Sequence, residues 1–410
     1  MTTNQDFTSD EPGVGGGTAT STRTGSFTLW RDLPTTVWIL VLARAVNRLG
    51  AFTLPFLAVI LVQDSHASVS QAGYLLAGFG LATIPSRLFG GRLSDAVGCR
   101  TTILVGLVGT AAAQLLVSGA QSLVQAGVAV IVLGLVFEIY EPPSQAVIAD
   151  VTPADRRPVA FGVLAAAMAV AGMGAGLLAA LVAGIDLRWL FVIDAATCLA
   201  CAALVGVLLP ATAGRGRDRG AEPVRAWSDP RLLAMLAVGT AFAVVYLQVT
   251  IALPLTLTQR GQPVSAIGVL LSVSAGTVVL AQPLVGRPFL RGMDDFSAMA
   301  VGFVVLAAGL LATGFATTLP AFVAAAVVWS LGDLLLLGRA YTIVAGIAPD
   351  RGRGRYLAVY GVSWGIAAVA APLIGTQLLD RGGPRLAWTC VALTCLVLAA
   401  LQPRLRRRLR

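Results

Sequence analysis

The dominant feature of this sequence is a series of apolar stretches separated by short polar breaks. A helix needs about 20 consecutive apolar residues to cross the hydrocarbon core of a bilayer. Only 12% of the residues are charged and 57% are hydrophobic, whereas about a quarter of a soluble domain is charged. We therefore predict an all-α integral membrane protein with twelve transmembrane helices. The twelve stretches are residues 36–62, 70–88, 102–120, 124–148, 159–183, 189–209, 232–258, 265–284, 297–317, 319–347, 356–379 and 386–401.

The distribution of basic residues predicts the orientation in the membrane. All 29 of them are arginine. If the N-terminus is cytoplasmic, 21 arginines fall in inner segments, four in outer loops and four within helices. Basic residues concentrate on the cytoplasmic side of membrane proteins. We therefore expect a multi-pass protein of the cell membrane with both termini in the cytoplasm. The same bias explains the net charge of +9 without a nucleic-acid surface.

The longest internal polar segment, residues 210–231, divides the twelve stretches into six and six. The two sides are similar, because residues 69–76 match residues 264–271 at five of eight positions, 195 residues apart. Parallel repeats of this kind build many transporter folds. We predict two pseudo-symmetric six-helix bundles, residues 31–209 and 232–401, joined by the basic cytoplasmic loop 210–231. A flexible cytoplasmic tail, residues 1–30, precedes them, and a basic cytoplasmic tail, residues 402–410, follows.

The break after the second stretch contains a recognisable motif. Residues 91–100 read GRLSDAVGCR. The two glycines permit a tight turn and a close approach of the flanking helices. An aspartate at this place can accept hydrogen bonds from helix N-terminal amides or pair with an arginine. The segment resembles the signature loop GxLaDrxGrk of the major facilitator superfamily (MFS). The resemblance implies the twelve-helix MFS fold and a cytoplasmic latch between the halves at Gly91, Leu93, Asp95, Gly98 and Arg100.

A second segment narrows this resemblance. Residues 142–153, followed by Arg156 and Arg157, are similar to the helix 4–5 region of bacterial twelve-helix drug:proton antiporters in this superfamily. The antiporter motif of helix 5 is present only in part, as Gly172 and Gly176, and Leu177 replaces its proline. A GxxxG pair favours close packing of helices. Helix 4 carries carboxylates where such antiporters carry an arginine.

Charges inside the predicted helices are the main candidates for function, because a charge near the bilayer centre costs at least about 2.5 kcal/mol. Two groups each share one helix face by their spacing. The rise of 1.5 Å per residue places Arg44 level with Glu141, and Arg48 level with Glu138. A carboxylate beside a fixed arginine can carry a proton or contact substrate, or the pairs can be permanent links between helices 1 and 4. The candidates in the two groups are Arg44, Asn47 and Arg48, and Glu138, Glu141 and Gln145.

The remaining intramembrane charges receive separate predictions. Asp333 lies near the middle of helix 10, and we expect it to face a central cavity. Asp194 lies near the outer end of helix 6, where we expect a structural role and a partner such as Arg188 or another group of the outer half. Arg87 lies near the inner end of helix 2, where we expect its side chain to extend toward the membrane surface.

The sequence excludes several classes of function. It contains no lysine, so it has no GxxxxGK[ST] nucleotide-binding loop. It has one histidine, which excludes the common His-based metal sites. We predict no enzyme, no metal or cofactor and no nucleic-acid partner. The predicted function is alternating-access secondary transport by a monomer in the lipid bilayer, with proton-coupled efflux of a small, partly hydrophobic compound.

Three alternatives remain open. The first is a proton-coupled importer or facilitator of a small polar or anionic solute, which Arg44 and Arg48 would bind. The second is a receptor or scaffold that transports nothing. The third is a membrane-embedded enzyme, for which the sequence offers neither a metal cluster nor a nucleophile–histidine pair.

Overall fold

The computed structural model describes residues 33–51, 53–153, 156–210, 226–285, 292–336, 338–349 and 353–409, and within these ranges the chain is helical with no β-strand. The predicted tail 1–30 and most of the loop 210–231 lie outside the described residues. The N-terminal half contains α2 (Thr35–Leu49), α3 (Thr53–Gln63), α4 (Val69–Val97), α5 (Cys99–Gly119), α6 (Leu123–Phe137), α7 (Glu141–Val151), α8 (Arg157–Val182) and α9 (Arg188–Leu208). The C-terminal half contains the short 3₁₀ helix η1 (Ala226–Ser228), α10 (Pro230–Gln259), α11 (Ser265–Val285), α13 (Asp295–Phe315), α14 (Leu319–Leu336), α15 (Arg339–Ile347) and α16 (Arg353–Leu409).

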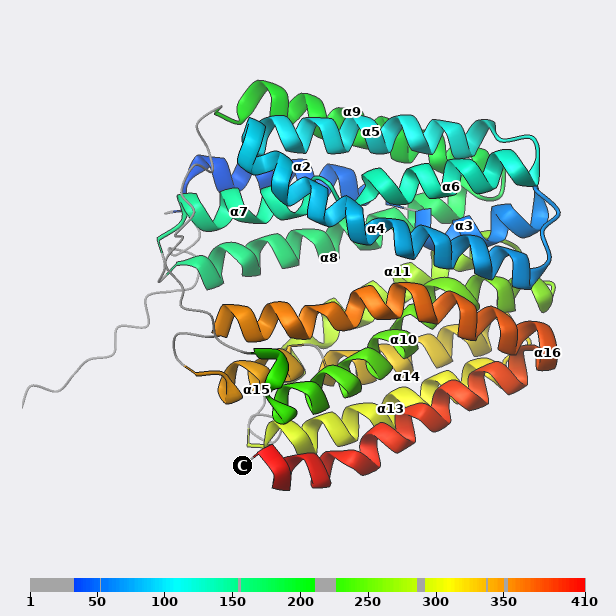
Figure 1. The fold of residues 1–410 in the computed structure, drawn as a ribbon. Helices are drawn as coiled ribbons and strands as arrows, with labels where there is room; N and C mark the ends of the chain where they lie inside the picture. The colour runs from blue at the N-terminus through cyan, green and yellow to red at the C-terminus, as the bar shows by residue number, and fades with distance from the viewer. Residues whose placement is uncertain are drawn as a thin grey trace, which may run out of the picture.

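The two halves form two adjacent groups of helices. In Figure 1, α2 to α9 occupy the upper part of the bundle and α10 to α16 the lower part. α2 begins and α16 ends at the same end of the bundle, on the left of the view. α5 and α13 are both 21 residues long and begin 196 residues apart, and α6 and α14 also begin 196 residues apart. This spacing agrees with the repeat that the sequence predicted.

Three stretches predicted as continuous helices are interrupted, which corrects the sequence-based boundaries. Residues 36–62 form α2 and α3, residues 124–148 form α6 and α7, and residues 319–347 form α14 and α15. The second interruption follows from Pro142 and Pro143, which have no N–H to donate, so that a new helix starts at Glu141. The third lies at Gly338, whose φ of 82° is a left-handed conformation that glycine adopts without steric cost.

The described ranges contain ten candidate membrane spans that are long and apolar enough to cross a membrane, and three of these are the interrupted pairs α2–α3, α6–α7 and α14–α15. α4 is not among them, although its 29 residues are enough to span a bilayer. α16 is counted once, but Gly383 inside it has a φ of 66° and a ψ of −172°, so two helices meet there. With α4 and both parts of α16, the arrangement agrees with twelve crossings. Residues 402–409 continue α16 as helix and do not form a separate tail.

Described contacts between the halves lie toward the end of the bundle away from the termini. At the start of α4, the Ser70 hydroxyl donates to an Asp380 carboxylate oxygen of α16 at 2.5 Å. Farther along the interface, the Ser272 hydroxyl of α11 donates to the Met173 carbonyl of α8 at 3.0 Å. Gly176 of α8 lies so close to α11 that an added Cβ would be 2.7 Å from the Gly268 carbonyl oxygen. Close packing was predicted for Gly176, and here it joins the two halves.

Candidate functional site

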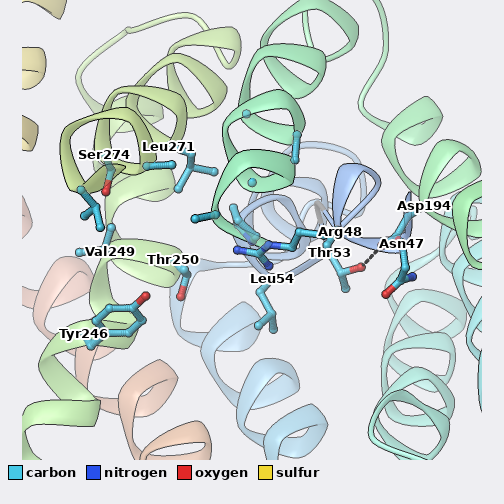
Figure 2. Close-up of a pocket in the computed structure, with 18 of the residues that line it drawn as sticks. Asn47, Arg48, Thr53, Leu54, Asp194, Tyr246, Val249, Thr250, Leu271 and Ser274 are labelled. Atoms are coloured by element: carbon cyan, nitrogen blue, oxygen red, sulfur yellow. Dashed lines mark hydrogen bonds between the residues drawn. The ribbon is translucent and has the colours of Figure 1, made fainter. Parts of the chain in front are cut away.

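A cavity of about 310 Å³ lies between the halves and is lined by both. Its N-terminal wall comes from α2, α3, α5, α6, α8 and α9 and the segment after α6, and its C-terminal wall from α10, α11 and α14. Figure 2 shows side chains of both walls directed toward a common space. The cavity is therefore the candidate substrate site. The lining residues with polar or charged side chains are Asn47, Arg48, Thr53, Thr110, Tyr140, Asp194, Cys198, Tyr246, Thr250, Ser274 and Asp333.

Arg48 supplies the positive charge of this cavity. Its side chain extends from the last turn of α2 toward the α10 wall (Figure 2). An added Cβ on Gly172 of α8 would be 3.6 Å from Arg48 Nε, so Gly172 faces the cavity and leaves room for this side chain. Arg48 is exposed and forms no ion pair with any described residue. The predicted pairing of Arg48 with Glu138 is wrong.

Arg44, one turn earlier on α2, forms an ion pair with Glu141 at the start of α7, as their equal predicted depth suggested. The guanidinium carbon of Arg44 also lies 4.9 Å from the centroid of the Tyr140 ring. Glu141 accepts a second hydrogen bond from the Gln145 side-chain amide at 2.9 Å. Neither Arg44 nor Glu141 lines the cavity. The pair therefore links helices 1 and 4 beside the candidate site.

Glu138 faces a different partner. Its carboxylate accepts from Arg87 Nη2 of α4 at 3.1 Å, and its backbone N–H donates to the Ser86 hydroxyl at 3.0 Å. Arg87 was expected to extend toward the membrane surface; its side chain is 58% exposed, and its pairing with Glu138 was not predicted. Since the chain leaves the helical path between Phe137 and Glu141, Glu138 no longer shares a face with Glu141.

Asn47 and Asp194 belong to a buried polar cluster around the interruption of helix 1. Asp194 of α9 accepts from the Thr53 hydroxyl at 2.6 Å and from Gln114 Nε2 of α5 at 2.7 Å. Asn47 Nδ2 donates to Cys198 Sγ at 3.2 Å. Thr53 is the first residue of α3, and Asn47 lies in the last turn of α2. The cluster therefore holds both sides of the interruption. The 4% exposed Asp194 has the structural surroundings that we expected.

Arg188 is not the partner of Asp194, since Arg188 Nε donates to Asp64 at 3.2 Å. Thr53 and Gln114 instead provide the other outer-half partner that the prediction allowed. The sequence analysis also missed that Asp194 lines the cavity. The available signal for this position was the spacing of four residues between Asp194 and Cys198, which puts both side chains on one face of α9.

Asp333 is the acidic residue of the C-terminal wall. It lines the cavity from α14, as predicted, and is 5% exposed. Its Oδ1 atom is buried without a hydrogen-bond partner among the described residues. Arg339, six residues later, turns away and pairs with Asp295 of α13 at 3.0 Å. Asp333 therefore differs from Asp194, the acidic residue of the other wall, whose carboxylate accepts from Thr53 and Gln114.

Two aromatic side chains, Tyr246 and Trp329, belong to the C-terminal wall together with aliphatic ones, and further aromatic side chains pack behind Tyr246. Tyr246 packs edge-on against Trp364 with ring centroids 5.3 Å apart, and Phe242 lies 6.2 Å from Tyr246. Trp329 lines the cavity one turn before Asp333. The sequence analysis did not select these residues. Aromatic side chains are common in any membrane helix, and only the fold brings those of α10, α14 and α16 together.

Residues 91–100 are not a loop, which corrects the sequence-based description. Gly91, Leu93 and Asp95 lie in the last turns of α4, and only Gly98, with a φ of 86°, interrupts the helix. Arg100, at the start of α5, donates through Nη2 to the Gly206 carbonyl of α9, a contact within the N-terminal half. Gly98 provides the predicted turn. The predicted latch between the halves stays a hypothesis.

Two helical bundles with a cavity between them, lined by an arginine on one side and a carboxylate on the other, define a class of membrane transporter. The family model described as Major Facilitator Superfamily matches residues 40–296 and residues 249–409. The chain therefore belongs to the major facilitator superfamily, a family of secondary transporters and not of enzymes.

Individual relatives are distant but cover most of the chain. The uncharacterized MFS-type transporter YhjO of Bacillus subtilis (strain 168) is 26% identical over 86% of this chain and 88% of its own length. The multidrug resistance protein MdtH of Aeromonas hydrophila is 23% identical over 86% of this chain and 90% of its own.

Solved structures support the fold at lower identity. A bacterial homolog of the human lysosomal transporter Spinster, in an inward-facing and occupied conformation, has a TM-score of 0.70 at 16% identity, over 91% of this chain and 96% of its own. The POT family transporter PepTSo has a TM-score of 0.75 at 12% identity, over 92% and 98%.

Proposed function

We propose that this transporter exports a small, partly hydrophobic compound in exchange for protons. The observation that carries the proposal is the cavity between the halves, where the buried carboxylate of Asp333 lies in a wall that also contains Tyr246 and Trp329. Such a wall provides an apolar surface for a drug-like or metabolite-like compound, with few polar groups to orient it. The distant similarity to the multidrug resistance protein MdtH supports the same direction and substrate class.

Among the candidate carboxylates, we assign the coupled proton to Asp333. Glu138 and Glu141 are held by Arg87 and Arg44, and breaking either pair in each cycle would cost energy. Asp333 has no such partner among the described residues. Asp333 can take up a proton while the cavity is open to one side of the membrane. It can release that proton when substrate binds or when the cavity opens to the other side. We retain Glu138, Glu141 and Gln145 as structural links of helix 4.

The test uses the purified protein in proteoliposomes with an imposed pH gradient and a panel of hydrophobic cations, neutral drugs and organic anions. Gradient-driven movement of a panel compound, with a matching proton flux, is the expected result. Asp333→Asn should abolish the gradient-driven part while counter-exchange of labelled substrate continues. Asp186→Asn, in an exposed loop outside the cavity, is the matched control and should transport normally. Equal gradient dependence in Asp333→Asn would contradict the assignment.

Arg48 favours a second candidate function, import of a small anionic solute. It is exposed in the cavity and forms no ion pair with a described residue, so it can bind a carboxylate or phosphate group of a substrate. The same panel separates the two functions. An importer would accumulate an organic anion and would not move the hydrophobic cations of the panel. Arg48→Gln would remove the anion accumulation.

We further propose that the α4–α5 junction acts as a cytoplasmic latch. This proposal is supported by the motif at Gly91, Leu93, Asp95, Gly98 and Arg100 and by the arginine bias, which favours a cytoplasmic position for this junction and both termini. We also propose that the protein works as a monomer in the cell membrane. Asp95 is exposed at the end of α4, so Asp95→Asn should leave the free energy of unfolding within about 0.5 kcal/mol of wild type and still slow transport severalfold. Wild-type transport in this variant would exclude the latch.

A further inference from the structure

A second cavity of about 310 Å³ lies far from the candidate substrate site, between the first turns of α13 and the last turns of α16. Both elements lie at the edge of the bundle in Figure 1, at the end where the chain terminates. α13 contributes Phe296, Ser297 and Ala300, and α16 contributes Gln402, Arg406 and Arg407. It shares no lining residue with the cavity between the halves.

The lining of this cavity is uncharged at its deeper level and contains both arginines at its shallower level. Ala300 lies one turn deeper on α13 than Phe296 and Ser297, and Gln402 lies one turn deeper on α16 than Arg406 and Arg407. The last apolar stretch ends at Leu401, so Arg406 and Arg407 lie where the helix leaves the hydrocarbon region. A phospholipid changes from acyl chain to charged headgroup over the same level of the membrane.

The positive charge here is only partly neutralised. Arg406 Nη1 lies 3.4 Å from an Asp294 oxygen, and Asp294 is also bound by the Ser297 hydroxyl at 2.6 Å. Arg407 is exposed and has no described ion-pair partner, and Arg404 and Arg408 add further charge on the same helix. Arginine binds phosphate groups through a planar fork of donors, and basic pockets between membrane helices bind anionic lipid headgroups.

We propose that this cavity binds the phosphate headgroup of an anionic phospholipid, with Arg406 and Arg407 at the phosphate and Phe296 and Ala300 against the glycerol and first acyl carbons. On the predicted topology the lipid belongs to the cytoplasmic leaflet. Among the described residues, α9 ends at Leu208 without arginines in its last turn, whereas the last turn of α16 contains Arg406, Arg407 and Arg408. The bound lipid holds the end of α16 to α13 and anchors the C-terminal half to the membrane surface.

The test compares phosphatidylglycerol with phosphatidylcholine of identical acyl chains, using the full chain in detergent micelles. Thermal melting measures the stabilisation on titrating each lipid, and native mass spectrometry counts the lipids retained. Wild type should bind phosphatidylglycerol preferentially. Arg407→Gln, which leaves the Arg406–Asp294 contact in place, should weaken that binding about fivefold, and Arg406→Gln with Arg407→Gln should weaken it about fivefold again.

The matched control is Arg404→Gln with Arg408→Gln, which removes the same charge from exposed positions that do not line the cavity. It should bind phosphatidylglycerol like wild type. Equal weakening of phosphatidylglycerol binding in the control would show that the arginines attract anionic lipid without a specific site, and it would overturn the proposal. Stabilisation by inorganic phosphate in phosphatidylcholine, without preference for phosphatidylglycerol, would assign the cavity to a free anion and also overturn the proposal. No headgroup preference in wild type would do the same.

Discussion

The two halves share a fold but treat their membrane-buried charges differently. In the N-terminal half, Arg44 pairs with Glu141, Arg87 pairs with Glu138, and Asp194 is surrounded by hydrogen-bond donors. In the C-terminal half, Asp333 faces the cavity with one oxygen buried and unpartnered among the described residues. The difference indicates a division of labour. Apart from Arg48, which faces the cavity without an ion pair among the described residues, the charges discussed in the first half hold interrupted helices together, whereas the second half leaves a carboxylate able to change its protonation state.

The interruptions of helices 4 and 10 also differ in how charged residues are used around them. Helix 4 is interrupted just before Pro142, and the residues around its interruption bind both α2 and α4 through ion pairs. Helix 10 is interrupted at Gly338, where left-handed backbone forms the break, and Arg339 pairs outward with Asp295. Removing charge should therefore destabilise the first half and leave the second half folded but inactive.

The largest effect is expected from breaking the Arg44–Glu141 pair. Glu141→Gln leaves a 12% exposed arginine without its counter-charge, which costs about 3–5 kcal/mol for a buried pair. We expect poor expression and a much lower melting temperature in detergent. Arg44→Glu combined with Glu141→Arg should recover part of the loss, because it restores a pair of opposite sign. A double-mutant cycle measures the coupling between the two residues. If the stability loss of the double variant equals the sum of the losses in the two single variants, the pair contributes nothing.

A smaller loss is expected at Asp194. Asp194→Ala removes the acceptor used by Thr53 and Gln114, and a buried donor left unsatisfied costs about 1–3 kcal/mol. Because these donors belong to α3 and α5, the loss should appear as lower thermal stability and as faster hydrogen exchange around the interruption of helix 1. Asp194→Asn keeps one acceptor oxygen and is the control that should lose less. Equal stability of Asp194→Ala and wild type would contradict the structural role.

Asp333 should respond in the opposite way. Asp333→Asn removes a charge from a position without a described counter-charge, so its melting temperature should equal or exceed that of wild type, against the loss of about 1–3 kcal/mol expected for Asp194→Ala. Gradient-driven transport should nevertheless disappear. Melting and transport measured on the same preparation separate these effects. If Asp333→Asn unfolds like Glu141→Gln, the two halves do not differ in the way described.

The sequence predicted those features that depend on one helix at a time. Hydropathy and the arginine bias predicted the crossings, and the rise per residue was sufficient to match Arg44 with Glu141 across two helices. Depth was not sufficient for Glu138, because Pro142 and Pro143 interrupt the helix and turn that carboxylate toward Arg87. The prolines were visible in the sequence. The assumption of one continuous helix was the error.

The cavity itself could not be predicted in full, because its walls come from helices of both halves whose relative position no local pattern specifies. Asp333 was identified because a carboxylate at mid-membrane is rare. Tyr246 and Trp329 were missed because aromatic residues in membrane helices are ordinary, and their grouping depends on how α10 and α14 pack.

The smallest predicted effect lies outside the membrane, at the start of α13. The Ser297 hydroxyl and backbone N–H hold the pKa of Asp294 below its ordinary value of 3.8, with a further contribution from Arg406, while partial burial acts in the opposite direction. A carboxylate whose pKa is lower in the folded state adds stability above its unfolded pKa, and this stability is lost as the pH falls through the folded value. The contribution is therefore complete at neutral pH, starts to fall near the unfolded pKa of about 4, and is lost as the pH drops through the lower folded pKa.

Asp294→Asn tests this step, because asparagine caps a helix about as well as aspartate but carries no charge. Its stability at neutral pH should fall by less than about 1 kcal/mol, the range of partly exposed ion pairs. The difference from wild type, followed by thermal melting between neutral and acidic pH, should shrink as Asp294 becomes protonated in wild type. A difference that stays constant down to pH 3 would mean that the cap geometry, and not the charge facing Arg406, stabilises this end of the C-terminal half.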